Sequence, residues 1–291
     1  MKKLLYQLFI LLLVSTPTFA QTADADTSWK MGGFIGITFN QVSLSNWVQG
    51  GENSMSLSGN AKLFANYAKD KTEWANDLIM NYAMVRTKTD GLTKSDDRID
   101  LNSKYGHKLS DKWLLSLLFN FKSQFAPGYE YPNDTVLISD IFSPAYFTLG
   151  VGVTWKPVEY FEVFLSPATA KLTIVNNQPL ADAGAYGVKP GENSRLEFGA
   201  YLNLKFKKEI VKNVTLTSKL ELFDNYTDEN PDNRSRIDVN WDSYLDMKIN
   251  DFLTASLNVL VLYDADIIEK TQVKEMFGIG IGIKFPKEEK K

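Results

Sequence analysis

From residue 33 onward, apolar and polar side chains alternate along most of this chain. The last such stretch is the clearest: residues 277–285 place phenylalanine or isoleucine at odd positions and glycine or lysine at even positions. Alternation with a period of two indicates a β-strand, whose successive side chains point to opposite faces. Residues 33–40 show a similar pattern. We expect these two terminal strands to pair and close one sheet into a barrel, an arrangement that leaves no unpaired edge.

The sequence contains twelve alternating segments in all. They cover residues 33–42, 54–69, 72–87, 95–110, 112–125, 142–156, 159–175, 193–208, 212–225, 234–249, 251–265 and 270–285. Connections of one to three residues alternate with longer ones, among them 43–53, 126–141 and 176–192. Short turns at one end and long loops at the other are typical of bacterial outer-membrane barrels, whose short turns lie in the periplasm. The pattern predicts an all-β fold, a transmembrane antiparallel up-and-down β-barrel of about 12 strands over residues 31–285.

The chemistry of the two strand faces decides which side of the barrel meets lipid. Residues 193–208 carry leucine, phenylalanine and alanine on one face, and charged or polar side chains with one glycine on the other. In a soluble barrel the apolar set would point inward, but about eight strands already enclose as much space as side chains can fill. With twelve strands, the apolar face is therefore expected to face lipid and the charged face to line the lumen. Aromatic residues near the turns (Tyr67, Trp74, Tyr105, Trp113, Trp155 and Phe206) are expected to form an interfacial girdle.

The N-terminus predicts export. Lys2 and Lys3 precede an apolar run and the small-residue end Thr18-Phe19-Ala20, which is the pattern of a cleaved signal peptide over residues 1–20. Residues 21–30 are expected to form a short periplasmic segment and residues 286–291 a charged periplasmic tail. Loss of two lysines changes the formal net charge from −3 to −5, which gives no reason to expect nucleic acid as a partner. The expected location is the cell outer membrane.

Charged side chains of both signs are predicted to face the lumen. They are Lys62, Arg98, Asp100, Lys104, Lys122, Glu162, Arg195, Glu197, Lys205, Lys219, Glu221, Arg236, Asp238, Asp242, Asp246 and Lys248. One interpretation is a polar pore whose charges select solutes. The other is an ion-paired interior that braces the barrel and blocks flow, and the mixture of signs favours this second interpretation.

Catalytic, metal and cofactor sites are not expected. His107 is the one histidine, and alternation places it on the outer face without a suitable serine, so no catalytic triad is predicted and the protein is not expected to be an enzyme. Residues 224–235 are rich in oxygen ligands but do not have the spacing of a known calcium loop. The chain contains no cysteine, which excludes disulfides and thiolate metal sites.

Several short motifs resemble those of a known family. Ser45-Asn46-Trp47 is followed by Gly50-Gly51-Glu52-Asn53, and further motifs occur at 143–144, 165–173 and 187–191. Together they resemble the Bacteroidetes outer-membrane family catalogued as domain of unknown function 3078. The resemblance implies an outer-membrane β-barrel without an established activity, so it assigns no functional residues. Its strongest motif is the loop carrying Trp47, Gly50 and Gly51.

Three functions remain open at this stage. The polar inner face favours a passive channel for small solutes or ions, without a cofactor. The mixed charges and Trp47, an aromatic residue in a loop, favour a structural or scaffolding barrel that partners other envelope proteins without transporting. An outer-membrane lipid-modifying enzyme is disfavoured by the lack of a catalytic group. In each case outer-membrane lipid surrounds the barrel.

Overall fold

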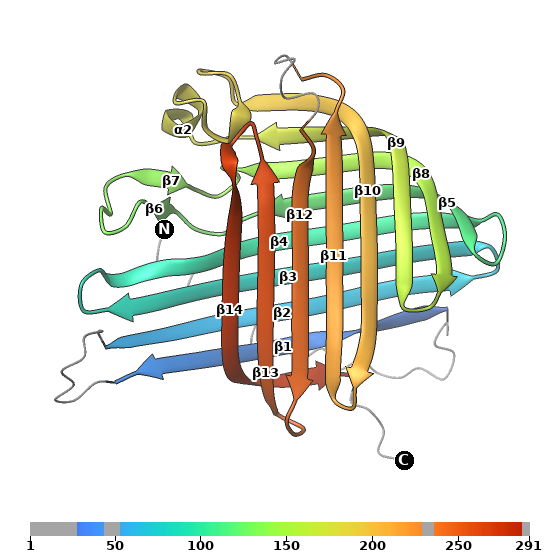
Figure 1. Ribbon diagram of the computed structural model, residues 1–291, viewed down its shortest axis with the longest axis horizontal. Coiled ribbons are helices and arrows are strands. Elements are labelled where there is room, and N and C mark those ends of the chain that lie inside the picture. The colour runs from blue at the N-terminus through green and yellow to red at the C-terminus, as the bar shows by residue number, and fades with distance from the viewer. Residues whose placement is uncertain (1–27, 44–52, 229–235, 287–291) are drawn as a thin grey trace.

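The fold was analysed in a computed structural model that describes residues 28–43, 53–228 and 236–286 (Figure 1). The expected signal peptide, most of the charged tail and the loop motif with Trp47, Gly50 and Gly51 lie outside the described residues. The described chain forms one closed antiparallel barrel with two small insertions at one end.

Twelve strands make up the barrel, as the alternation predicts. They are β1 (Trp29–Val42), β2 (Ser54–Lys69), β3 (Thr72–Thr87), β4 (Gly91–Lys108), β5 (Trp113–Ser123), β8 (Ala145–Val158), β9 (Phe161–Ile174), β10 (Ser194–Val211), β11 (Val214–Asn225), β12 (Asp238–Lys248), β13 (Leu253–Asp264) and β14 (Ile268–Phe285). Neighbours in sequence are neighbours in the sheet, and β1 pairs with β14 to close it. In Figure 1 the front strands β10–β14 cross the strands behind them, as expected for strands tilted within a barrel.

Glycines allow the two terminal strands to approach closely. β1 and β14 pair antiparallel from Gly33 opposite Phe285 to Phe39 opposite Ile279. On the inner face the Phe34 ring lies against β14, and a Cβ built at Gly282 would come within 2.2 Å of that ring. The glycine face of the last strand therefore makes room for side chains of the first.

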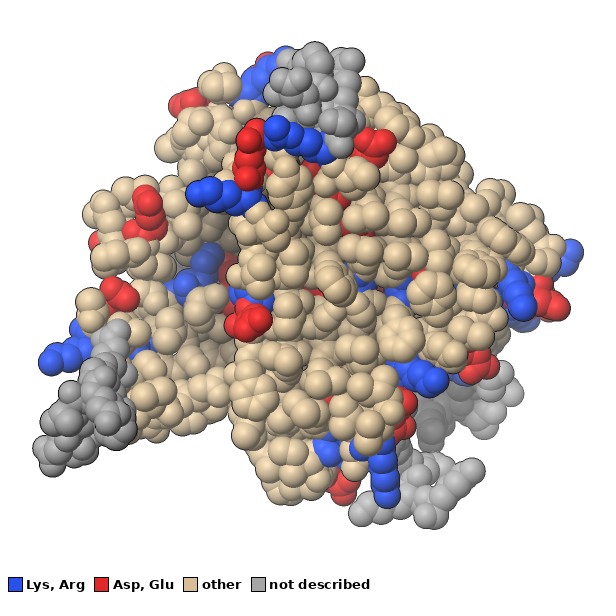
Figure 2. All heavy atoms as spheres, viewed as in Figure 1, with Lys and Arg blue, Asp and Glu red and all other residues tan. Residues whose placement is uncertain are grey.

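The outer wall is apolar. Ile37, Leu117, Phe198 and Ile281 are each at least 43% exposed, although all four lie within strands. Figure 2 shows one side of this wall, on which Lys, Arg, Asp and Glu lie mainly toward the margins. A soluble protein rarely exposes a continuous apolar surface of this kind, and a closed barrel can face lipid because all its strand edges are paired. The fold is that of a transmembrane β-barrel.

Aromatic side chains gather near the short turns. Trp29 lies 5.2 Å from Tyr67 and 5.9 Å from Trp74 between ring centroids. Trp113 stacks on Trp155 at 6.1 Å, and these rings are 46% and 37% exposed. This is the placement expected of a girdle at the lipid–water boundary. We call this end, where β1 begins and β14 ends, the turn end, and we call the opposite end the loop end.

A bulge in β9 reverses its alternation. Ser166 and Thr169 are both fully buried on the inner face, although an unbroken alternation would place them on opposite faces. The register against β10 shifts at this point, which leaves Pro167 and Ala168 outside regular pairing. A bulge adds a residue to one strand, and proline fits there because it lacks a donor for the ladder. As a result, the remainder of β9 presents its odd-numbered residues to the lumen.

The loop end differs in two ways from the sequence prediction. Its third and eleventh connections are short, because β4 already begins at Gly91 and β14 at Ile268. The β5–β8 connection and the β9–β10 connection, by contrast, contain secondary structure of their own. The first forms a hairpin of β6 (Gly128–Tyr129) and β7 (Leu137–Ser139), and the second contains α2 (Gln178–Asp182) and the 3-10 turn η1 (Ala185–Gly187).

We expect a methyl group at the seam to destabilise the barrel. A Cβ at Gly280 would lie 2.4 Å from the Ile37 carbonyl oxygen, so Gly280→Ala forces the β1–β14 backbones apart and costs about 1–3 kcal/mol. Gly59 in β2 is the matched control, since a Cβ there meets nothing within 4 Å. Urea unfolding in detergent, followed by tryptophan fluorescence, would compare the two variants. Equal stability of both would contradict this account of the seam.

Candidate functional site: the ion-paired interior

Charged side chains from opposite walls meet inside the barrel. Arg98 of β4 contacts Asp242 of β12 at 2.5 Å. These strands stand opposite each other, because five strands separate them in either direction around the barrel. The contact between them therefore crosses the full width of the lumen.

A central cluster surrounds this contact. It consists of Arg98, Asp100, Lys122, Lys219, Glu221 and Asp242, and we call it the central brace. The second arm of the Arg98 guanidinium binds Asp100 at 2.7 Å, and Lys219 binds Glu221 at 3.0 Å. Lys122 of β5 reaches Glu221 of β11. Three cations thus balance three carboxylates, so the cluster is neutral as a whole.

Neutral side chains complete the bonding of the brace carboxylates. The amides of Asn120 and Asn258 donate to Asp100 at 2.8 Å and to Asp242 at 2.7 Å, and the Tyr201 hydroxyl donates to Glu221 at 2.6 Å. The three carboxylates are 3–6% exposed. Charges buried to this degree are tolerated only when they are paired and hydrogen-bonded. The brace meets this requirement.

An apolar cluster fills the lumen beside the brace. Leu118 of β5, Phe164 of β9, Tyr201 of β10 and Phe223 of β11 form this cluster and are at most 6% exposed. Twelve strands leave more space than small barrels do, so large side chains are needed to exclude water. Packed rings and paired charges together occupy this level of the barrel.

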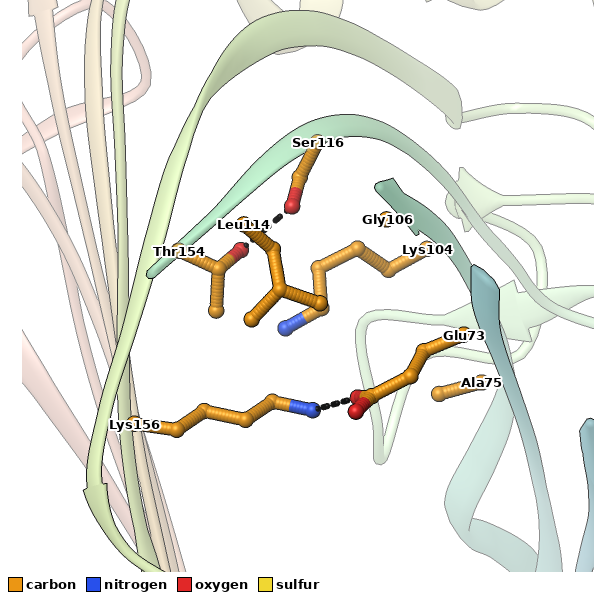
Figure 3. A pocket seen from close by; sticks show the side chains of 8 residues that line it. All are labelled: Glu73, Ala75, Lys104, Gly106, Leu114, Ser116, Thr154 and Lys156. Carbon is orange, nitrogen blue, oxygen red and sulfur yellow. Dashed lines mark hydrogen bonds and ion pairs between the residues drawn. The ribbon is translucent and has the colours of Figure 1, made fainter. Parts of the chain in front are cut away.

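A second set of ion pairs lies at the turn end. Glu73 binds Lys156 at 2.5 Å and Lys108 at 3.2 Å, while Glu162 binds Lys104 and Lys156. Figure 3 shows Glu73 and Lys156 reaching toward each other beside the hydrogen-bonded hydroxyls of Ser116 and Thr154. The cavity between them measures about 10 Å³, which is close to the space that one water needs.

Further pairs cross the lumen elsewhere. Lys205 of β10 binds Asp77 of β3 at 2.7 Å, and Lys62 of β2 binds Asp246 of β12 at 3.0 Å. The Lys62 ammonium also lies 3.9 Å from the centroid of the Tyr244 ring, a cation–π contact. These contacts tie strands that are not neighbours in the sheet.

Carboxylates outnumber cations in the layer nearest the loop end. Lys171 lies 2.7 Å from Asp238 and 3.7 Å from both Glu197 and Asp264. Arg195 contacts three carboxylates, those of Glu197 at 3.2 Å, Asp228 at 3.9 Å and Asp266 at 2.6 Å. Among the described residues, these contacts bring five carboxylates to two cations.

An apolar lid covers part of the loop end. Leu180 and Ala181 of α2 pack with Val175 and Val188, and Leu137 of β7 lies against them. The Tyr186 hydroxyl donates to the Ile138 carbonyl at 2.5 Å, which joins the two insertions. Burial raises the pKa of Tyr186 to about 12, so its hydroxyl remains a donor at neutral pH. The segment 176–192 therefore lies over the mouth of the barrel.

The structure brings all sixteen predicted lumen residues into ion pairs. Two of them lie at the ends of the barrel. Arg236 binds Glu269, which is 68% exposed, at the loop end, and Lys248 binds Asp251, which is 72% exposed, at the turn end. Neither contact reaches the central brace. His107 is exposed, and part of loop 224–235 lies outside the described residues.

Several interior charges were missed by the sequence prediction. They are Glu73, Asp77, Asp96, Lys156, Lys171, Asp264, Asp266 and Lys274. Lys171 was missed because the bulge at Pro167 reverses the alternation of β9, and that proline was the available signal. The inner face of β3 also carries Ala75 and Ala83, which weakened its polar pattern around Asp77.

The described residues contain no group of three or more His, Cys, Asp or Glu side chains placed to hold a metal ion. They also contain no helix long and apolar enough to cross a membrane.

Residues 39–129 match the model of a family described as "Protein of unknown function (DUF3078)". The match begins in β1 and ends in β6, and it confirms the resemblance seen in the sequence motifs. No curated protein matches this chain.

Solved structures similar to this protein are distant membrane barrels. The translocator domain of autotransporter NalP from Neisseria meningitidis is 12% identical, covers 96% of this chain and 95% of its own, and has a TM-score of 0.39. The COG4313 outer membrane channel from Pseudomonas putida F1 is 13% identical, with 90% and 99% covered and a TM-score of 0.40. Outer membrane phospholipase A from Escherichia coli is 10% identical, with 87% and 96% covered and a TM-score of 0.36.

Removing the central cation should destabilise the barrel strongly. Arg98→Met leaves Asp100 and Asp242 buried without their shared partner, and we expect a loss of about 3–5 kcal/mol in unfolding free energy. Lys248→Met is the matched control, because its exposed partner Asp251 remains solvated and the expected loss is at most about 1 kcal/mol. Urea titration of both variants in detergent measures the difference. A loss at Arg98 no larger than at Lys248 would show that the brace does not stabilise the barrel.

Proposed function

We propose that this protein is a non-transporting outer-membrane barrel that serves as a structural scaffold in the cell envelope. The observation that carries the proposal is the Arg98–Asp242 contact, which joins opposite walls inside the lumen. A passive channel needs a continuous aqueous path. In this barrel the buried brace and the apolar cluster beside it occupy the middle of that path.

Opening the lumen would require breaking the brace. Three brace carboxylates would have to lose partners within a poorly hydrated interior, where an unpaired charge costs several kcal/mol. Thermal motion alone does not supply that energy often enough for steady diffusion of solutes. The mixed signs of the brace also provide no ring of one charge, which is the device that selects ions in open pores.

The outer membrane is the proposed location. The apolar wall requires lipid, and the N-terminal pattern of residues 1–20 directs export. Barrels that span the bacterial outer membrane keep their short turns in the periplasm. We therefore place the turn end in the periplasm and the loop end, with its lid, outside the cell.

The proposed role includes no catalysis. His107 points outward from β4 at the girdle level, next to the exposed Tyr105. Its neighbours across the sheet are Thr72 and Leu115.

Conductance in planar bilayers tests the closed lumen. We expect no current steps from the wild-type protein and none from the rim variant Arg236→Ala, whose pair with Glu269 lies outside the brace. The double variant Arg98→Ala with Asp242→Ala removes both partners of the contact across the lumen and is expected to conduct. Its folding would be checked by heat-modifiable migration in gels.

Steps from the wild type would overturn the proposal in favour of a passive channel for small solutes or ions. Silence of a folded double variant would locate the seal in the apolar cluster instead of the brace.

Contact with other envelope proteins is the second part of the proposal. Val136 lies in the loop between β6 and β7 beside the charged Asp134, and it is 40% exposed although apolar. A photo-crosslinking residue at Val136 is expected to give protein adducts in intact cells. The same residue at Leu202, on the lipid face of β10, is the control and should give none. Adducts at neither position would contradict a scaffolding role for this loop.

A further inference from the structure

A cavity of about 200 Å³ lies at the loop end, apart from the braced interior. It is formed by the first residues of β4, the loop that carries β6 and β7, and Lys274 of β14. Ile138 and Lys274 are 47% and 37% exposed in their side chains, so the cavity is open to the surrounding solvent. The chemistry of its walls indicates what could occupy it.

The charges in the cavity wall are already balanced. Lys94 binds Asp97 at 2.9 Å, and Lys274 binds Asp96 at 2.6 Å. Two cations therefore face two carboxylates, and the wall has no net charge. An ionic ligand would find no uncompensated partner in it.

One of these pairs already uses most of its hydrogen-bonding capacity. The three ammonium hydrogens of Lys94 have acceptors in Asp97, Gln124 and the Ala126 carbonyl. The Asp97 carboxylate accepts in addition from the backbone N–H groups of Phe125 and Ala126, at 2.7 and 2.9 Å. This pair anchors the loop to β4 and leaves little capacity for a ligand.

Other groups in the wall keep donors and acceptors available. Lys274 has three ammonium hydrogens and one carboxylate acceptor, Asp96, among the described residues. Tyr129, Tyr131 and Ser139, which each carry a hydroxyl, line the same cavity. The two tyrosine rings meet edge to face, with centroids 6.2 Å apart. The cavity thus combines hydroxyl groups with aromatic surface and lacks net charge.

We propose that this cavity binds a neutral saccharide unit. A sugar ring presents hydroxyls that both donate and accept, together with C–H faces that pack on aromatic rings. Tyrosine supplies an apolar body with a polar tip, which suits such a ligand. Small-molecule sites generally pair aromatic side chains with a few placed polar groups. The size of the cavity fits one ring, with further units extending into solvent past Ile138.

The site does not depend on the proposed scaffold role. The cavity lies at the mouth, whereas the central brace lies within the barrel, so saccharide binding can occur whether or not the lumen conducts. A binding measurement can therefore contradict the saccharide site without contradicting the closed lumen, and a conductance measurement can do the reverse.

Isothermal titration calorimetry on the detergent-solubilised full chain tests the proposal. The probes are glucose, galactose and N-acetylglucosamine, with glucuronate and inorganic phosphate as anionic comparisons. We expect at least one neutral sugar to bind. Tyr129→Ala should weaken that binding by about tenfold, which corresponds to about 1.4 kcal/mol. The smaller change Ser139→Ala, which removes a single hydroxyl, should weaken it several-fold.

Tyr226→Ala is the matched control. Tyr226 is also at the loop end and is 55% exposed, but it does not line the cavity, so its removal should leave binding unchanged. Heat-modifiable migration would establish that each variant remains a folded barrel. Binding of glucuronate or phosphate without any neutral sugar would overturn the proposal. So would the absence of binding by every probe, or equal losses in Tyr129→Ala and Tyr226→Ala.

Discussion

Pairing of buried charge is the constraint on which this barrel depends. Its outer face meets lipid, so polar side chains must point inward, and twelve strands enclose more volume than backbone alone can fill. Arg98, Asp100 and Asp242 show how the two demands are met together. Long charged side chains span the lumen, and each carboxylate of the central brace has a cation and a neutral donor. The brace is then stable only when all its members are present, because loss of one charged side chain leaves its buried partner unpaired.

The same constraint accounts for the contrast between the seam and the rest of the wall. Most strands bring side chains that reach inward, whereas β14 brings Gly278, Gly280 and Gly282. These glycines let Phe34 and Thr38 of β1 lie directly on the neighbouring backbone. Closure of the barrel therefore rests on close approach, whereas the opposite side relies on ion pairs across the lumen.

The fold could be predicted well from the sequence, because alternation with a period of two shows which side chains of a strand face lipid and which face the lumen. All twelve barrel strands were expected, and β2 and β3 agree with the structure to the residue. Pairings inside the lumen could not be predicted, because Arg98 and Asp242 lie 144 residues apart and alternation fixes only the face on which each points. Lys171 was missed for a local reason. The bulge at Pro167 reverses the predicted inward or outward direction of every later residue in β9. The cavity at the mouth had no signal at all, because Tyr129, Ser139 and Lys274 meet only in three dimensions.

A closed lumen changes where recognition can take place. When the brace seals the middle of the barrel, solutes that approach the loop end meet only the groups that line the mouth, and any selectivity at that end must reside in those groups. Lys94 and Asp97 fix the β6–β7 loop to the barrel wall, so Tyr129 and Tyr131 are held in place before a ligand arrives. Prior positioning of this kind lowers the entropy lost on binding. The ion pairs thus have two roles. Within the lumen they exclude water, and at the mouth they fix the loop that forms a small neutral cavity.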